Sequence, residues 1–137
     1  MKNSMQEATI LNDYRIIAMV GLSPDPNRPS YRVAKYLINQ GYKIIPVNPD
    51  TQEIFGTRSY SNVSSIPETI EIVDIFRRSE EVMPIVDEAI KVGAKAVWMQ
   101  EGVVNEEAAS KAQDAGLLVV MDRCMLKEHK RLNKKHD

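Results

Sequence analysis

The sequence predicts an α/β fold in which one parallel β-sheet carries helices on both faces. Short apolar runs alternate along the chain with stretches whose apolar residues recur at helical spacing. Glycines follow several of the helical stretches, at the place where helices commonly end. The chain has 137 residues, of which 43% are hydrophobic, so it fits one domain with a core of ordinary size. We therefore expect residues 1–137 to form a single domain.

The first elements are a helix, a strand and a second helix. Residues 5–13 form a short leading helix, and the apolar run at 16–20 is a strand that ends at Gly21. Residues 31–40 place four apolar side chains on one face. Ser30 directly precedes this stretch and is the predicted N-cap, because its hydroxyl can accept a free N–H of the first turn.

The second and third strands are separated by a long link of weak pattern. Residues 43–47 form the second strand; Pro46 cannot donate to a neighbouring strand and therefore belongs near the strand end. Residues 48–71 contain prolines, a glycine and several serines, which indicate a loop or a short helix. Residues 72–76 form the third strand.

The C-terminal half repeats the alternation of helix and strand. Ser79 is the predicted N-cap of a helix that runs to residue 92, with two glutamates in its positive first turn. The remaining predicted elements are strands at 96–99 and 117–121 and helices at 105–115 and 125–134. Trp98 lies in the fourth strand and is predicted to pack in the core.

Five apolar runs joined through helices imply right-handed crossovers and a parallel sheet. Counted along the chain, we expect the strand order 3-2-1-4-5 in one doubly wound, Rossmann-like sheet. Ligands bind to such sheets beyond the carboxyl ends of the strands, where the strand order reverses. The predicted order puts this switch point between strands one and four, and it makes the segments after the strands the candidate site.

The segment after the first strand lacks the dinucleotide-binding fingerprint G-x-G-x-x-G. Only Gly21 is present, Ser23 stands at the position of the second glycine, and three prolines follow. An NAD site needs an Asp or Glu at the end of the second strand to bind the ribose. Here the second strand ends in Asn48, and the nearest acidic residue is Asp50, two positions later. Both departures argue against NAD(P). A helix N-terminus and Arg28 can still bind an anion here.

Composition excludes several other classes of function. The formal net charge is -1, which argues against nucleic-acid or membrane-surface binding. Cys124 is the one cysteine, so no internal disulfide forms and a reducing compartment is expected. The N-terminal residues carry charges and no apolar core run, unlike a signal peptide. We therefore expect a cytoplasmic protein that binds neither nucleic acid nor membrane.

Five groups of residues at the predicted strand ends carry a family resemblance. They are VGLS at 20–23 with NRPSY at 27–31, PVNP at 46–49, VDIFRR at 73–78, WMQEGV at 98–103 and MDRCM at 121–125. In this order the chain resembles the stand-alone CoA-binding proteins, whose fold is that of the N-terminal domain of the succinyl-CoA synthetase α subunit. The resemblance covers about residues 12–132.

The resemblance implies coenzyme A as the ligand and suggests a place for each group of residues. The implied contacts are Gly21, Ser23 and Arg28 with the phosphates, Val47, Asn48 and Pro49 with the adenosine, Phe76, Arg77 and Arg78 along the cleft, Gln100, Glu101 and Gly102 along the pantetheine, and Cys124 at its far end. One arginine of the pair after the third strand is expected to meet a phosphate, and the sequence does not distinguish the two.

The resemblance does not carry the ligase activity with it. The synthetase phosphorylates a histidine in a second domain, whereas the two histidines here, His129 and His136, lie near the C-terminus without partners at metal-ligand spacing. We therefore expect a monomer or homodimer that binds CoA or an acyl-CoA without catalysis, with chemistry supplied by a partner protein.

Three alternatives remain open from the sequence. The first is a thiol-dependent or acyl-transfer enzyme centred on Cys124, since a helix start can lower the pKa of a thiol. The second is an NAD(P)-binding sensor domain. The third is a protein–protein module whose ligand pocket is vestigial.

Overall fold

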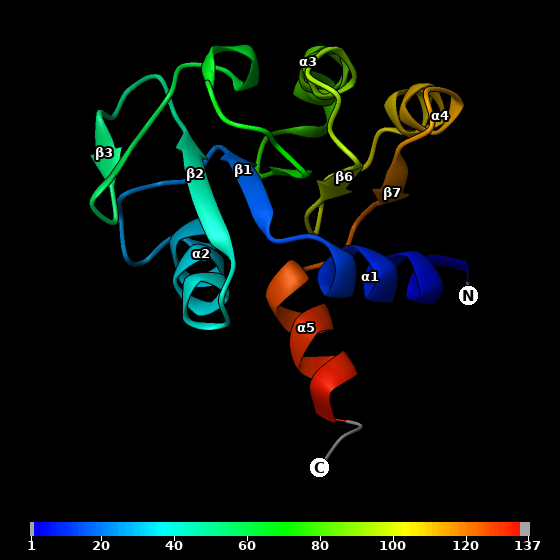
Figure 1. The fold of residues 1–137 in the computed structure, drawn as a ribbon, viewed down its shortest axis with the longest axis horizontal. Helices are drawn as coiled ribbons and strands as arrows, with labels where there is room; N and C mark the ends of the chain where they lie inside the picture. The colour runs from blue at the N-terminus through cyan, green and yellow to red at the C-terminus, as the bar shows by residue number, and fades with distance from the viewer. Residues whose placement is uncertain (1, 135–137) are drawn as a thin grey trace.

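Two layers of helices enclose one parallel sheet in the computed structural model, which describes residues 2–134 (Figure 1). The sheet strands are β1 (Ile16–Val20), β2 (Lys43–Val47), β5 (Ile72–Ile75), β6 (Ala96–Met99) and β7 (Leu118–Val120). The helices are α1 (Lys2–Asp13), α2 (Pro29–Asn39), α3 (Val82–Lys91), α4 (Glu106–Asp114) and α5 (Met125–Lys134). The link after β2 holds a hairpin of β3 (Glu53–Ile54) and β4 (Thr57–Arg58) and the 3-10 turn η1 (Val63–Ser65).

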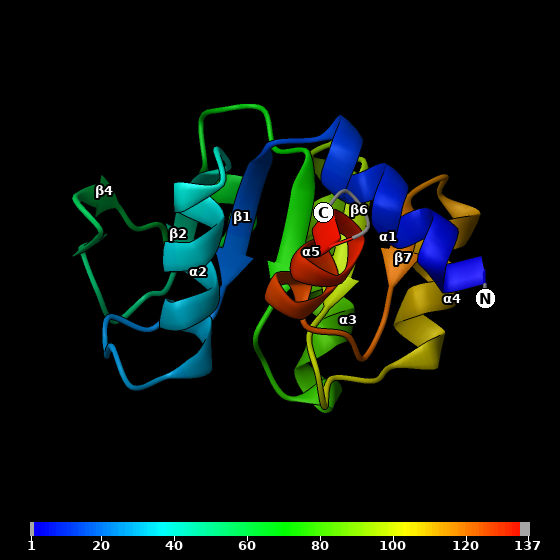
Figure 2. The ribbon, with the colours of Figure 1, turned by 90° about the horizontal axis from the view of Figure 1, so that it is seen from below.

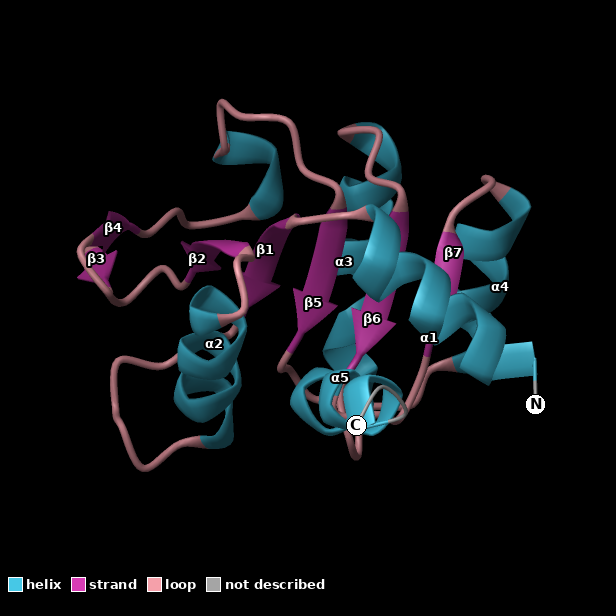
Figure 3. Ribbon diagram, turned by 60° about the horizontal axis from the view of Figure 1, so that its bottom comes forward, coloured by secondary structure: helices cyan, strands magenta, loops and turns pink. Residues whose placement is uncertain are grey.

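The α/β fold class and the doubly wound arrangement are confirmed. Helices α1, α2 and α5 lie on one face of the sheet, and α3 and α4 lie on the other (Figure 1). Figure 3 shows the arrows of β1, β5 and β6 pointing the same way, as parallel pairing requires. Each predicted strand is present, with ends that move by no more than a residue at each side.

The predicted strand order is wrong in one placement. The observed order is β2-β1-β5-β6-β7, which is 2-1-3-4-5 when the strands are counted along the chain. The third strand, β5, pairs with β1, where Ile75 stands opposite Val20, and it does not lie beyond β2. From β1 the chain first adds a strand on one side, β2, and then adds β5, β6 and β7 on the other side. The strand order therefore reverses between β1 and β5, and the switch point lies there rather than between strands one and four.

The link over residues 48–71 explains this placement. Tyr60 forms a parallel bridge with Val47 on the outer edge of β2, so that edge is already occupied. The chain then crosses the face covered by α3, where Val63 packs in the same apolar cluster as Val73 of β5. The apolar residues of the link thus carry it back across the sheet to the free side of β1.

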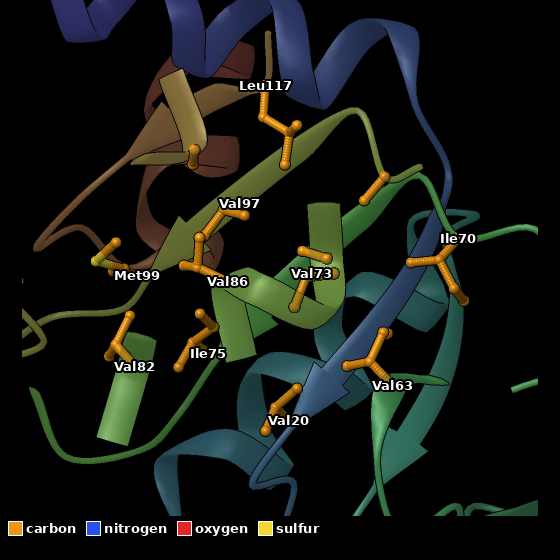
Figure 4. Close-up of a cluster of buried hydrophobic side chains, with 14 of the residues drawn as sticks. Val20, Val63, Ile70, Val73, Ile75, Val82, Val86, Val97, Met99 and Leu117 are labelled. Carbon is orange, nitrogen blue, oxygen red and sulfur yellow. The ribbon is translucent and has the colours of Figure 1, made fainter. Parts of the chain in front are cut away.

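An apolar cluster lies on each face of the sheet. On the face under α3 and α4, Val73 and Ile75 of β5 lie close to Val86 of α3 (Figure 4). The other cluster contains Trp98, which is fully buried as predicted. Its indole N–H donates to the Arg123 carbonyl at 2.9 Å, which satisfies the polar edge of a core side chain.

The predicted N-cap of the second helix is wrong. Helix α2 begins at Pro29, so Arg28 is its N-cap and makes no side-chain capping bond. Proline suits this first position because it has no N–H to satisfy and its φ is already helical. Ser30 is therefore inside the helix, buried, and its hydroxyl accepts the Ser23 backbone N–H at 3.0 Å.

Ser79 is also not an N-cap. It begins the short 3-10 turn η2 (Ser79–Glu81), and its hydroxyl accepts the Val104 backbone N–H at 2.9 Å. Its side chain thus joins the loop after β5 to the loop after β6. Helix α4 does have a side-chain N-cap, because the Asn105 side chain accepts the Ala108 N–H at 2.9 Å.

Helices α1 and α5 lie beside each other on one face of the sheet (Figure 2). The buried Glu7 of α1 accepts a hydrogen bond from Arg131 of α5 at 3.0 Å. His129 of α5 bonds the Tyr36 hydroxyl of α2 at 2.6 Å, so this histidine joins two helices. His136 lies outside the described residues. Among residues 2–134, no helix is both long enough and apolar enough to span a membrane.

Gly21 lies where the ends of β1, β2 and β5 meet. Its φ is +88°, and a Cβ built on it would lie 2.2 Å from the Phe76 carbonyl oxygen. Its N–H donates to the Val47 carbonyl at 2.9 Å, and the Phe76 N–H donates to the Val20 carbonyl at 2.8 Å. Only glycine satisfies both the backbone conformation and this close approach.

We expect Gly21→Ala to lower the free energy of unfolding by about 3 kcal/mol, because strain at positive φ adds to a backbone clash. Gly41→Ala is the matched control. Gly41 also has positive φ, +95°, but nothing lies within 4 Å of a Cβ placed there. It should cost about 1 kcal/mol. Urea unfolding measures both, and equal losses would show that the contact with Phe76 is unimportant.

Candidate functional site

Two adjoining cavities open at the carboxyl ends of the strands. Their volumes are about 560 Å³ and about 340 Å³, and Gly21, Arg77 and Glu81 line both. Small-molecule sites commonly enclose roughly 300–1,000 Å³. The cavities meet between β1 and β5, which is where the strand order reverses and where ligands bind to sheets of this kind.

The structure brings most of the predicted contact residues together. The larger cavity is lined by nine of them: Gly21, Ser23, Arg28, Phe76, Arg77, Arg78, Gln100, Glu101 and Cys124. The smaller cavity is lined by Val47, Asn48 and Pro49. Gly102 lines neither of these two cavities. Its N–H donates to the Asp122 carboxylate at 2.8 Å, so it holds the turn after β6 in place.

The loop between β1 and α2 is held by its own polar groups. The Ser23 N–H donates to the Ser30 hydroxyl at 3.0 Å, and the Ser23 hydroxyl accepts the Asp25 N–H at 3.0 Å. The loop ends at the N-terminus of α2, whose first turn has no acidic residue. This positive helix end borders the larger cavity through Pro29 and Ser30 and favours an anionic ligand.

The three arginines of the larger cavity differ in their partners. Arg77 and Arg78 each reach Glu81 at 2.9 Å, and Arg78 lies 3.7 Å from Glu80. The hydrogen bond from Arg78 and the charge of Arg77 lower the pKa of Glu81. Within residues 2–134, the exposed Arg28 side chain has no hydrogen bond or ion pair. Arg28 is therefore the arginine whose charge is available to a ligand without displacing a carboxylate.

Asn48 joins the loops that follow β1 and β2. Its Nδ2 donates to the Leu22 carbonyl at 2.9 Å, and its Oδ1 accepts the Asp50 N–H at 2.8 Å. The side chain thus fixes the wall of the smaller cavity. The polar atoms of the Asn48 side chain therefore already have protein partners.

A buried polar pair lies beneath the larger cavity. Asp74 is fully buried in β5, and Gln100, which is 3% exposed, donates from Nε2 to its Oδ1 at 2.6 Å. The Oδ2 atom of Asp74 has no partner within the described part of the chain. Burial raises the pKa of Asp74 from 3.8 to about 7, against the opposing hydrogen bonds from Gln100 and the Ile75 backbone.

Cys124 lies at the wall of the larger cavity, directly before α5. The alternative of an enzyme centred on Cys124 needs a lowered thiol pKa, and the structure gives the opposite direction. Burial raises the pKa, and the backbone N–H groups of Lys127 and Leu126 at the helix start do not compensate. The nearby carboxylates of Glu101 and Asp74 raise it further. The thiol is therefore poorly suited to act as a nucleophile.

Several cavity residues escaped the sequence analysis. The missed lining residues include Ser30, Val33, Glu81 and Val103 in the larger cavity and Ser61, Asn62 and Glu88 in the smaller one. Glu81 had a detectable signal, because it stands four and three residues after two arginines. Asp74 had one as well, as a carboxylate inside an apolar strand. Ser61 and Asn62 had none, since their segment reaches the cavity only through the crossover.

Comparison with known proteins identifies the family. The CoA binding domain family matches residues 15–130. The chain belongs to this family. The Bacillus subtilis protein YneT is 41% identical over 120 residues, which are 88% of this chain and 89% of YneT. The solved structure of a hypothetical protein from Pyrococcus horikoshii has a TM-score of 0.91 at 45% identity, and the match covers 95% of this chain and 92% of that one.

Larger enzymes contain a related domain. The alpha subunit of ADP-forming acetate–CoA ligase II from Pyrococcus furiosus is 30% identical over 132 residues, which are 87% of this chain but 29% of that subunit. The apo structure of a dinucleotide-forming acetyl-coenzyme A synthetase from Ca. Korarchaeum cryptofilum has a TM-score of 0.71 at 26% identity and is matched over 26% of its length. The resemblance inferred from the five motifs is therefore confirmed for this CoA-binding domain.

Because the pKa of Asp74 is raised, we expect the free energy of unfolding to depend on pH. Between pH 3.8 and about 7 the folded state holds this proton and the unfolded chain does not, so stability falls as the pH rises through that window. Asp74→Asn cannot ionise and escapes this loss. From about pH 5 to about pH 8, urea unfolding should shift in favour of the variant, relative to the wild type, by about 2–3 kcal/mol.

Glu68→Gln is the control for this measurement. Glu68 is an exposed carboxylate that pairs with Lys43, far from the cavities. Its removal should leave the dependence of stability on pH unchanged between about pH 5 and about pH 8. The same dependence in wild type and Asp74→Asn would mean that Asp74 is ionised in the folded protein like an ordinary carboxyl.

The raised pKa of Cys124 makes a second prediction. Its alkylation by iodoacetamide should be slow at neutral pH, and the rate should still be rising beyond pH 9.0, the ordinary thiol pKa. The chain has one cysteine, so mass spectrometry follows this site alone. A rate that levels off below about pH 8 would show an activated thiol and would favour an enzyme centred on Cys124.

Proposed function

We propose that this protein binds coenzyme A, free or acylated, at the carboxyl ends of its parallel strands, and that it does not catalyse a reaction alone. The observation that carries the proposal is the cleft at the switch point. The chain belongs to the CoA binding domain family. Its cleft consists of two adjoining cavities, and most of the residues that carry the family resemblance line them. We also propose that residues 1–137 act as one cytoplasmic domain.

The shape of the cleft suggests how the ligand lies. The adenosine would occupy the smaller cavity beside Asn48 and Pro49, after β2. The phosphates would cross near Gly21, which lines both cavities. The pantetheine arm would then follow the larger cavity toward Gln100 and Cys124. This path keeps the charged part of the ligand at the helix N-terminus and the neutral part near buried groups.

Arg28 is the best candidate for a direct phosphate contact. It stands at the N-cap of α2, its side chain is exposed, and within residues 2–134 it has no ionic partner. Arg77 and Arg78 share Glu81, so a phosphate that recruits either one must compete with that carboxylate. The helix end and Arg28 together supply a charge-assisted site of the kind that phosphates prefer.

The absence of catalysis is proposed from the chemistry of the cavity. Burial raises the pKa of Cys124, and Glu101 is paired with Lys127 at 3.0 Å. Neither residue is poised to act as a nucleophile or a base. The acetate–CoA ligase subunit is more than three times as long as its match to this chain. We propose that a partner protein supplies chemistry where it is needed, and that the chain itself is a monomer or homodimer.

Isothermal titration with CoA tests the proposal, with ADP and NAD as comparison ligands. We expect CoA to bind and NAD to bind at least tenfold more weakly, since the loop lacks the dinucleotide fingerprint. Arg28→Ala should raise the Kd for CoA by about tenfold to a hundredfold, as the loss of a hydrogen bond to a charged group does.

Lys35→Ala is the matched control, because it removes one exposed positive charge from the same helix without touching either cavity. It should change the Kd by less than about twofold. If both variants weakened CoA binding equally, Arg28 would act only through general electrostatic attraction and not through a direct contact. If folded wild-type protein bound no CoA under reducing conditions, the proposed function would fail.

A further inference from the structure

Asp74 and Gln100 form a buried side-chain pair at the larger cavity, and the proposed binding path gives Asp74 no role. Gln100 lines the larger cavity, whereas Asp74 lies behind it in β5. The distance between Gln100 Nε2 and Asp74 Oδ1 is 2.6 Å, and both side chains are almost wholly inaccessible to water. Such a contact fixes the orientation of an amide whose other end is left for the cavity.

The charge of Asp74 dictates which end of the amide it holds. An ionised carboxylate only accepts hydrogen bonds, so Gln100 must offer it the amide nitrogen and keep the amide oxygen for other partners. A protonated carboxyl must instead find an acceptor for the hydrogen bond that its O–H donates. A proton on Oδ2 would find no acceptor within the described residues, because that atom has no partner. A proton on Oδ1 can be donated to the Gln100 amide oxygen if the amide turns over.

We propose that Asp74 is a positioning residue that sets which end of the Gln100 amide faces the cavity. With Asp74 ionised, the Gln100 oxygen accepts an N–H of the ligand, which on the proposed path is an amide N–H of the pantetheine arm. With Asp74 protonated, Gln100 presents N–H donors and this contact is lost. The inference rests on the proposed function for its ligand, but the coupling of the two side chains exists without one.

Few titratable groups lie near enough to interfere. The register neighbours of Asp74 are Met19 on β1 and Trp98 on β6, and neither ionises near neutral pH. Cys124 at the start of α5 interacts with it electrostatically and remains a neutral thiol, since burial raises its pKa. Glu101 interacts with Cys124 and is paired with Lys127 across the cavity wall.

Within residues 2–134, Glu7 is another group that titrates in the same range, and burial lowers the pKa of His129 on α5 from 6.5. Burial and the neighbouring Glu128 raise the pKa of Glu7 to about 7, and it is held between α1 and α5 by Arg131 and Arg123. Glu7 is part of the contact between α1 and α5, where it accepts a hydrogen bond from Arg131. Because wild type and variants share both groups, their contribution cancels when the proteins are compared at the same pH.

The first test needs no ligand. In ¹⁵N-labelled protein, the side-chain N–H₂ signals of Gln100, assigned by their loss in Gln100→Leu, should shift with a midpoint near pH 7. In Asp74→Asn they should not titrate, and in Glu68→Gln they should titrate as in the wild type. Signals that stay constant between about pH 5.5 and about pH 8.5, or that titrate alike in Asp74→Asn, overturn the proposal.

The second test measures affinity for CoA and ADP at about pH 6 and about pH 8. In the wild type, CoA should gain about tenfold more affinity on raising the pH than it gains in Asp74→Asn or Gln100→Leu. Comparing proteins with the same ligand removes the titration of the ligand phosphates. ADP lacks the pantetheine arm, so its affinity should change alike in all three proteins, and Glu68→Gln should match the wild type.

The outcomes separate this inference from the proposed function. CoA binding whose pH dependence is the same in wild type, Asp74→Asn and Gln100→Leu would overturn the role of Asp74 and leave CoA binding intact. An equal loss of CoA and ADP affinity in the variants would show a purely structural role and would also overturn it. A wild type that binds no CoA would remove the proposed ligand contact together with the function, whatever the spectra show of the coupling.

Discussion

The close approach of Gly21 to the Phe76 carbonyl organises the rest of the structure. It lets the end of β1 lie directly against the end of β5, while the Gly21 N–H remains bonded to β2. Three strand ends therefore converge on one residue without a side chain. The two cavities open on either side of this point, and Arg77 projects between them as a shared wall. A side chain at position 21 would separate the strands and alter both cavities together.

Around this point the site is largely built before any ligand arrives. Ser23 and Ser30 hold the loop after β1, Asn48 ties it to the loop after β2, and Ser79 joins the loops after β5 and β6. Each contact removes freedom that binding would otherwise have to remove, which favours affinity. Arg28 is exposed and stands outside this network within residues 2–134. The cleft thus combines a frame held by hydrogen bonds with the exposed Arg28, which has no ionic partner within residues 2–134.

The larger cavity is lined by groups of different polarity. Three arginines, the N-terminus of α2 and Glu81 line it together with the neutral thiol of Cys124 and with Gln100, which bonds the buried Asp74 behind the cavity. The part of the Pyrococcus furiosus acetate–CoA ligase subunit that is similar to this chain makes up less than a third of that subunit.

The sequence by itself determined the elements and the place of the site. Apolar runs and helical periodicity predicted each strand of the five-stranded sheet within a residue or so, because those patterns report which faces are buried. The two-residue strands β3 and β4, which lie in the link over residues 48–71, were not predicted. The rule that ligands bind beyond the strand ends, with the motifs found there, predicted twelve residues that line the two cavities. These are local or topological properties, and the chain encodes them residue by residue.

Only the tertiary structure decided how those elements meet. The position of β5 beside β1 depends on the crossover of residues 48–71, whose pairing through Tyr60 and packing through Val63 are long-range contacts without a local pattern. The pKa of Cys124 depends on burial, which outweighs the helix start that the sequence reveals. The bond from Gln100 to Asp74 likewise exists because β5 and β6 are neighbours, and that adjacency is a property of the folded sheet.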